Sequence, residues 1–383
     1  MKLAIAKERR ANESRVAATP DTVKRLKGLG LDIVVEAGAG AGASISDEAY
    51  AAAGASIAPD AAAAVQDADI VLKVSRPMTS AEGTDEVQAM KRGAVLVAML
   101  DPYRNRDLVK ALAAQGVTAF AMELVPRITR AQSMDVLSSQ ANLAGYKAVL
   151  DATSEFGRAF PMMMTAAGTI APAKVFVMGA GVAGLQAIAT ARRLGAVVSA
   201  TDVRPAAKEQ VESLGASFVM VESEETKQAE TSGGYAKEMS EDYKRKQAAL
   251  VAEHIKKQDV VICTALIPGR PAPKLVSADM VRSMKPGSVI VDLAVENGGN
   301  CELAEAGKVV DANGVKIIGW TNVPGRIAVD ATALYARNLF NFLGIIVAKD
   351  GTLKIDPEDE IIKGSLLTRD GRVVHPAFAE TAA

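Results

Sequence analysis

Short apolar runs alternate with helix-like stretches along the first third of the chain. The stretches Pro20–Lys27 and Arg104–Ala114 space their apolar residues as amphipathic helices do. This alternation is typical of a parallel sheet covered on both faces, because the crossover helices bury both sides of the strands. The runs predicted as strands are Leu3–Ala6, Ile33–Val35, Ile70–Val74, Ala94–Leu100 and Val117–Met122.

A long predicted helix, Val136–Phe156, leads to a second alternating unit. The later stretch Asp330–Ala348 is helical with an apolar side, and we expect it to pack back on the first unit. We therefore predict an α/β fold of two Rossmann-like, doubly wound parallel-sheet domains with a cleft between them. The predicted domains are residues 1–135 with about 328–383, and residues 136–327. The second unit's predicted strands are Val175–Met178, Val197–Thr201, Val260–Thr264, Val289–Asp292 and Ile317–Ile318.

Composition excludes several classes of protein. Of 383 residues, 49% are apolar and 23% are charged, which excludes intrinsic disorder as the main state. The net charge is −1, and we expect no nucleic-acid partner because such binding needs a dense basic face. The two cysteines, Cys263 and Cys301, lie far apart, so we expect neither a disulfide scaffold nor a metal site. No apolar run reaches the roughly 20 residues that a bilayer needs, so a soluble protein is expected.

The strongest motif is a G-x-G-x-x-G sequence formed by Gly179, Gly181 and Gly184. It follows a predicted strand and opens a helix, and Asp202 ends the next predicted strand. In this context the glycines allow a tight turn, close approach to a pyrophosphate and tight helix packing. Asp202 is expected to accept hydrogen bonds from an adenosine ribose and to repel a 2′-phosphate, which favours NAD(H). Arg204 leaves tolerance of a 2′-phosphate open.

A second glycine-rich stretch, Gly38–Ala43, also fits a G-x-G-x-x-A pattern. No clean strand that ends in an acid follows it at the right distance. We therefore interpret it as a tight turn that lets the chain or a ligand come close.

Histidine is scarce, although most NAD dehydrogenases move a proton as well as a hydride. The chain has two histidines, His254 and His375, and we interpret both as solvent-facing or capping residues. Hydride transfer between two nicotinamide rings moves no proton to or from a heteroatom, so the protein supplies only orientation and close approach. A histidine-poor chain with an evident NAD motif suits that reaction.

Three stretches, Asn12–Pro20, Val35–Ser44 and Val177–Arg204, resemble the alanine dehydrogenase and nicotinamide nucleotide transhydrogenase superfamily. Alanine dehydrogenases carry a catalytic histidine after the fourth strand, whereas Val95–Pro102 contains none. The segments Arg127–Asp135 and Thr231–Met239 are similar to the transhydrogenase branch. The resemblance covers essentially the whole chain.

The resemblance implies an NAD(H)-binding component of a proton-translocating transhydrogenase. It implies a homodimer that passes hydride to NADP(H) on a partner component, coupled to proton movement through a membrane-spanning component. It also implies a cytoplasmic location, peripheral on the inner membrane through these partners. Arg127, Gln132 and Asp135 match the family's loop at the nicotinamide and are the predicted catalytic residues. The predicted cofactor-binding residues are these three with Ser138, Gly179, Gly181, Val182, Gly184, Asp202, Val203, Arg204, Gly234, Tyr235, Thr264, Ala265 and Leu266.

Two alternatives remain open. Arg15 and Lys73 match positions where alanine dehydrogenases bind a keto acid, so an amino-acid dehydrogenase is one. The other is a non-catalytic NAD-sensing module, in which the loop that carries Tyr235 signals occupancy to a partner.

Overall fold

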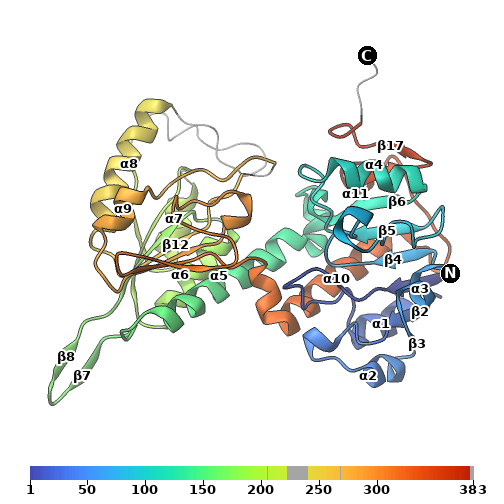
Figure 1. The fold of residues 1–383 in the computed structure, drawn as a ribbon, viewed down its shortest axis with the longest axis horizontal. Coiled ribbons are helices and arrows are strands. Elements are labelled where there is room, and N and C mark those ends of the chain that lie inside the picture. Colours follow the sequence, from blue (N-terminus) through green and yellow to red (C-terminus); the bar gives the residue numbers. More distant parts are fainter. Residues whose placement is uncertain (205, 222–239, 268, 380–383) are drawn as a thin grey trace. The chain divides into compact units, whose positions relative to one another are not determined.

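The computed structural model describes residues 1–204, 206–221, 240–267 and 269–379. The chain forms two units (Figure 1). The first consists of Met1–Gln140 and Gly325–Ala383, and the second of Ala141–Pro324.

The first unit is built on a sheet in the order β17-β16-β6-β5-β4-β1-β2-β3. The strands from β1 to β6 pair in parallel, and β16 pairs with β6 in antiparallel fashion. Alternate side chains of β1 enter different cores: Leu3 and Ile5 one, Ala4 the other. The strands are β1 Lys2–Ile5, β2 Asp32–Glu36, β3 Ser56–Ala58, β4 Ile70–Leu72, β5 Val95–Ala98, β6 Thr118–Ala121, β16 Leu366–Arg369 and β17 Arg372–Val373.

The helix α10, Ala328–Ile346, completes one of these cores. Its residues Tyr335, Leu339 and Phe342 are fully buried. The Tyr335 hydroxyl donates to the backbone oxygen of Lys73 at 2.9 Å, which fixes the helix to the end of β4. The expectation that this segment packs on the first unit is therefore confirmed. The unit's other helices are α1 Pro20–Lys27, α2 Asp47–Ala52, α3 Ala61–Val65, α4 Arg106–Gln115 and α11 Glu360–Ser365.

The second unit has a sheet in the order β11-β10-β9-β12-β13-β15-β14. The chain proceeds from β9 outward through β10 and then returns to β12 on the other side of β9, so the strand order reverses there. In open α/β sheets, ligands bind beyond the carboxyl ends of the strands at such a reversal. The strands are β9 Lys174–Met178, β10 Val197–Thr201, β11 Ser217–Phe218, β12 Val260–Cys263, β13 Val289–Asp292, β14 Val309–Ala312 and β15 Val315–Ile318.

Helices cover both faces of this sheet, because alternate residues of β9 enter two different cores. The helix α5, Val136–Glu155, leads into the unit from the first one. A separate hairpin, β7 Met163–Thr165 and β8 Gly168–Ile170, precedes β9. The remaining helices are α6 Val182–Arg193, α7 Ala206–Ser213, α8 Glu241–Ile255 and α9 Ala278–Ser283.

The predicted α/β class and the main elements are confirmed, and the differences occur mostly at edges. Several predicted strands are longer than the observed ones, since apolar residues continue into the following turn. The sheets are also not purely parallel, because β14, β16 and β17 pair in antiparallel fashion. The pattern missed β3, β11, β14, β16, β17 and the β7–β8 hairpin.

Candidate nucleotide-binding site

The glycine motif forms the turn between β9 and α6, as its spacing predicts. Gly179 has φ +101°, a conformation that favours glycine, and a Cβ there would lie 2.7 Å from Thr264 Oγ1. A Cβ on Gly184 would lie 1.8 Å from the Gly179 backbone oxygen, so only glycine lets the helix start this close to the strand. At Gly181, by contrast, nothing among the described residues lies within 4 Å of an added Cβ. This glycine therefore leaves room beside the backbone.

The N-terminus of α6 offers its backbone N–H groups to an anion. Gly181 precedes the helix, and no side chain caps it within the described structure. Val182, the first helical residue, is 38% exposed. Such a helix start carries a partial positive charge and unpaired N–H groups, which suits a pyrophosphate.

Asp202 lies beside this turn, directly after β10. Its Oδ2 accepts a hydrogen bond from the Ala180 N–H at 2.7 Å, so the carboxylate is held against the glycine loop. Arg204 donates to the same carboxylate through its backbone N–H, Nε and Nη2, at 2.7–2.9 Å. Val203, between them, is half-buried. The structure thus brings the predicted ribose acceptor and the glycine loop together.

The loop after β12 completes this edge of the sheet. The Thr264 hydroxyl donates to the Gly179 backbone oxygen at 2.9 Å. The backbone N–H of Ala265 donates to Asn300 Oδ1 at 3.0 Å, and Asn300 Nδ2 donates to the Ala265 backbone oxygen at 2.9 Å. Leu266 is 43% exposed. Asn300 is fully buried and positions the loop, but its role could not be predicted from the sequence. Its only signal is a polar residue after Gly298-Gly299, which is too common to single it out.

The predicted nicotinamide-end residues lie in the first unit, around a 3-10 helix, Thr129–Met134. Arg127 and Gln132 are exposed. Asp135 caps α5, since it accepts hydrogen bonds from the Ser138 N–H at 2.8 Å and from the Ser138 hydroxyl at 2.6 Å. Asp135 and Ser138 are therefore held together by the helix start.

The 3-10 helix is also tied to α10. Asn338 and Asn341 both donate from their side-chain amides to the Ser133 backbone oxygen, at 2.8 and 3.0 Å. These contacts lie within the first unit and hold the segment that carries Gln132 and Asp135. The predicted residues Gly234 and Tyr235 lie outside the described residues.

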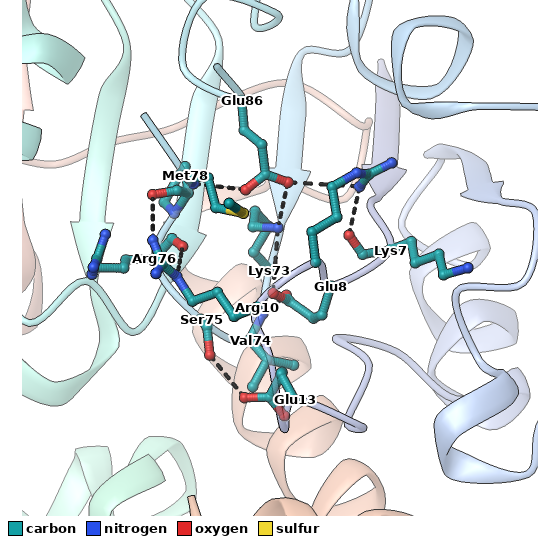
Figure 2. Close-up of polar contacts among 12 residues, drawn as sticks. Lys7, Glu8, Arg10, Glu13, Lys73, Val74, Ser75, Arg76, Met78 and Glu86 are labelled. Carbon is teal, nitrogen blue, oxygen red and sulfur yellow. Dashed lines mark hydrogen bonds and ion pairs between the residues drawn. The ribbon is translucent and has the colours of Figure 1, made fainter. Parts of the chain in front are cut away.

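Lys73 is at the centre of a buried ion cluster (Figure 2). Only 1% of it is exposed, and its Nζ lies 3.0 Å from Glu86 Oε1 and 3.3 Å from Glu8 Oε2. Burial lowers the pKa of Lys73, but the charges of Glu8 and Glu86 outweigh it, so the net direction is upward. Burial raises the pKa of Glu8 against the charge of Lys73.

Arg15 is held in the same way. Its Nε and Nη2 donate to the two carboxylate oxygens of Glu13 at 2.8 and 2.7 Å, and its Nη1 donates to Gln140 at 2.8 Å. Glu13 also accepts a hydrogen bond from Ser75 (Figure 2). Both candidate keto-acid residues, Arg15 and Lys73, are therefore neutralised by the chain's own carboxylates.

The histidines take up positions other than an acid–base site. His254 is half-buried on α8, where its Nε2 lies 2.8 Å from the Ser199 hydroxyl and its ring packs edge-on against Phe176. The interpretation of His254 as solvent-facing or capping is therefore wrong, because its ring fills the space against β9 and β10. His375 accepts a hydrogen bond from the Ala377 N–H and so stabilises a turn.

At the second glycine stretch, the chain comes close to itself. A Cβ on Gly42 would lie 2.6 Å from the Ser14 backbone oxygen, and one on Gly40 would lie 2.6 Å from that of Ile45. Within the described ranges, no group of three or more His, Cys, Asp or Glu side chains is placed to hold a metal ion. Every helix in that part of the chain falls short of the length or the apolar character that a bilayer crossing requires.

Two family profiles cover almost the whole chain. The profile "Alanine dehydrogenase/PNT, N-terminal domain" matches residues 4–144, and "Alanine dehydrogenase/PNT, C-terminal domain" matches residues 148–376. The chain is 61% identical to an NAD(P) transhydrogenase subunit alpha polypeptide of Rhodospirillum rubrum, over 99% of both chains. It is 31% identical to an alanine dehydrogenase of Halomonas elongata, over 99% of this chain and 96% of the other.

A solved structure has the same architecture. The transhydrogenase from Sinorhizobium meliloti matches with a TM-score of 0.85 and 57% identity, over 98% of this chain and 100% of that one. The chain therefore belongs to the alanine dehydrogenase/PNT family, in the branch whose curated members are NAD(P) transhydrogenase alpha subunits.

Proposed function

We propose that this chain is the NAD(H)-binding component of a proton-translocating transhydrogenase. Hydride passes from NADH on this chain directly to NADP⁺ on a partner component, and the transfer is coupled to proton movement through a membrane-spanning component. The observation that carries the proposal is the Asp202 carboxylate held on the Ala180 N–H at the reversal of strand order. A ribose acceptor beside an uncapped helix start is the donor and acceptor set that a dinucleotide requires.

The described residues of this edge fit the adenosine half of the cofactor. Asp202 accepts from the ribose hydroxyls, the N–H groups after Gly181 bind the pyrophosphate, and Thr264, Ala265 and Leu266 line the adenosine side. The space beside Gly181 is what lets phosphate oxygens reach the backbone.

By the family resemblance, the other half is held by Arg127, Gln132 and Asp135. Arg127 offsets pyrophosphate charge, Gln132 holds the carboxamide, and Asp135, braced by Ser138, holds the second ribose. NADH, when bound, supplies the hydride; the side chains named here only bind and orient. Orientation is what such a reaction needs, because alignment of two reacting groups removes much of the barrier without acid–base catalysis.

An alanine dehydrogenase activity is the second candidate, since a curated alanine dehydrogenase is 31% identical to this chain. Two observations disfavour it. Lys73 and Arg15 are paired with Glu8, Glu86 and Glu13, so a keto-acid carboxylate would have to displace buried ion pairs. The turn after β5 carries Asp101, with no histidine between Val95 and Pro102.

The partners follow from the proposal. The name "subunit alpha" of the relatives implies further subunits, and we place the NADP(H)-binding and membrane-spanning components among them. The chain then sits on the cytoplasmic face of the inner membrane through these partners. We also propose a homodimer, supported by the exposed methionines of the β7–β8 hairpin.

The decisive experiment reconstitutes the exchange. The purified chain is mixed with an NADP(H)-binding transhydrogenase component and with NADH deuterated at the transferable position. We expect deuterium to appear in NADPH with no hydrogen from solvent, and NADH binding but no turnover by this chain alone. Solvent hydrogen in the product would count against direct transfer. Oxidation of NADH with pyruvate and ammonium by this chain alone would establish the dehydrogenase instead, and binding without exchange would favour the NAD-sensing module.

A further inference from the structure

We propose that Asp202 and Arg204 act as a specificity pair, in which Asp202 withholds Arg204 from the 2′-phosphate of NADP(H). The sequence D-V-R leaves the cofactor choice open, because the carboxylate repels a 2′-phosphate and the guanidinium attracts one. The structure shows how the two side chains are arranged. The inference rests on the proposed function, since it assumes that this edge of the sheet binds the adenosine half of a dinucleotide.

The geometry commits the arginine to the aspartate. Arg204 Nε lies 2.9 Å from Asp202 Oδ1 and Nη2 lies 2.7 Å from Oδ2, so the guanidinium spans both carboxylate oxygens. Only 20% of the Arg204 side chain and 7% of the Asp202 side chain are exposed. A two-point contact between a planar guanidinium and a carboxylate is the geometry that Arg also uses for phosphate. One guanidinium edge therefore serves one anion at a time.

The aspartate is itself fixed in place. Its Oδ2 also accepts the Ala180 N–H at 2.7 Å, and its Oδ1 also accepts the Arg204 N–H at 2.9 Å. The carboxylate thus accepts four hydrogen bonds, one from the glycine loop and three from Arg204. Because the glycine loop anchors it, Asp202 cannot turn away and release the arginine to a 2′-phosphate.

The pairing of Asp202 with Arg204 affects the binding of both NADH and NADPH. A ribose diol donates hydrogen bonds to the Asp202 carboxylate, and Arg204 stays paired with the same carboxylate. A 2′-phosphate meets a negative charge together with a cation whose charge Asp202 already offsets. Replacing Asp202 by asparagine removes the repulsion and leaves the amide oxygen to accept the Ala180 N–H. Arg204 then pairs with the phosphate.

The experiment measures dissociation constants for NADH and NADPH with the full chain. The variants are D202N, R204Q and the double variant D202N/R204Q, with Arg193→Gln, on the exposed end of α6, as a control for loss of a cation. We expect D202N to gain on the order of tenfold in NADPH affinity and to lose NADH affinity. The double variant should lose that NADPH gain, and R204Q alone should still exclude NADPH.

The gain in D202N should also weaken with added salt, as expected for a guanidinium–phosphate contact at a partly exposed position. Equal NADPH affinity in D202N and D202N/R204Q would overturn the inference while leaving the proposed function intact. If the unmodified chain binds neither dinucleotide, the proposed function fails first. Thermal unfolding of each variant checks that the fold is retained.

Discussion

The carboxyl group of Glu123 lies where burial disfavours its charged form. It follows β6, and its Oε1 accepts the N–H groups of Leu100, at 2.7 Å, and Asp101. Its Oε2 is buried without a hydrogen-bond partner among the described residues. Burial raises the pKa of Glu123 to about 7, although the backbone hydrogen bonds act in the opposite direction. A proton is therefore retained in the folded state at pH values where the unfolded chain has lost it.

This gives a pH dependence with a definite sign. A folded-state pKa above the usual 4.5 means that the stabilising effect of the proton is complete below about pH 4.5 and is lost as pH rises to about 7. The contribution is on the order of 3 kcal/mol, at about 1.4 kcal/mol for each pKa unit. We expect Glu123→Gln, which keeps the Oε1 acceptor, to flatten the stability profile between pH 5 and 8.

Denaturant unfolding at several pH values measures this effect. Glu209→Gln, exposed on α7, is the matched control and should follow the unmodified chain. If E123Q keeps the full slope between pH 5 and 7, Glu123 is not the group responsible.

At the residue scale, the sequence predicted contacts that depend on short spacing. The close packing of Gly184 and the position of Asp202 follow from a strand, a turn and a helix that are contiguous in the chain. The Asn300 contact with Ala265 and the pairing of Arg15 with Gln140 depend on segments that lie far apart in sequence. Hydrophobic periodicity carries no information about such polar partners, so they required the structure.

At the scale of elements, the turn between β9 and α6 contains two glycines with different roles. Gly184 is required for packing, whereas Gly181 leaves space for the ligand. Gly184→Ala would place a Cβ 1.8 Å from the Gly179 backbone oxygen, so the helix start must move. We expect a loss of stability of about 2 kcal/mol or more, comparable with overpacking in a core. Gly181→Ala meets nothing within 4 Å among the described residues, and its φ of −77° suits alanine, so the fold should be retained.

Of the two variants, we expect G181A to weaken nucleotide binding without a loss of stability. The methyl group of G181A occupies the space through which phosphate oxygens reach the backbone, and we expect NADH affinity to fall at least tenfold with an unchanged melting temperature. Calorimetric titration and thermal unfolding of both variants measure the two effects. Unchanged NADH binding by G181A would mean that the pyrophosphate lies elsewhere.

The elements that the sequence missed share a physical cause. The strand β3 is Ser-Ile-Ala, and β17 is only Arg-Val, so neither offers a run of apolar residues. These strands form because a neighbouring strand provides a hydrogen-bonding edge, as β6 does for β16. By contrast, β10 and β13 are buried on both faces and have the apolar runs that the prediction used. The missed elements are therefore specified by their tertiary neighbours.

At the scale of the whole molecule, the β7–β8 hairpin is the feature that a single chain does not explain. Met162 is 59% exposed, Met164 is 77% exposed and Ile170 is 40% exposed. Strands of three residues form a hairpin that is marginally stable alone in water. Adjacent exposed apolar side chains on such an element are typical of an interaction site. A second copy of the chain is the partner that the proposed homodimer provides.

Charge introduced into the hairpin should then separate the dimer. Each methionine that is buried at an interface contributes about 2 kcal/mol, and a symmetric dimer carries each substitution twice, so M162K and M164K together should weaken association by at least about a thousandfold. Sedimentation of the double variant across a range of concentrations should show monomers where the unmodified chain is dimeric. Val374→Lys, which charges an exposed apolar residue of the first unit, should stay dimeric. NADH binding by the monomeric variant should persist, because the glycine loop and Asp202 belong to a single chain. A double variant that remains dimeric would exclude the hairpin as the principal contact.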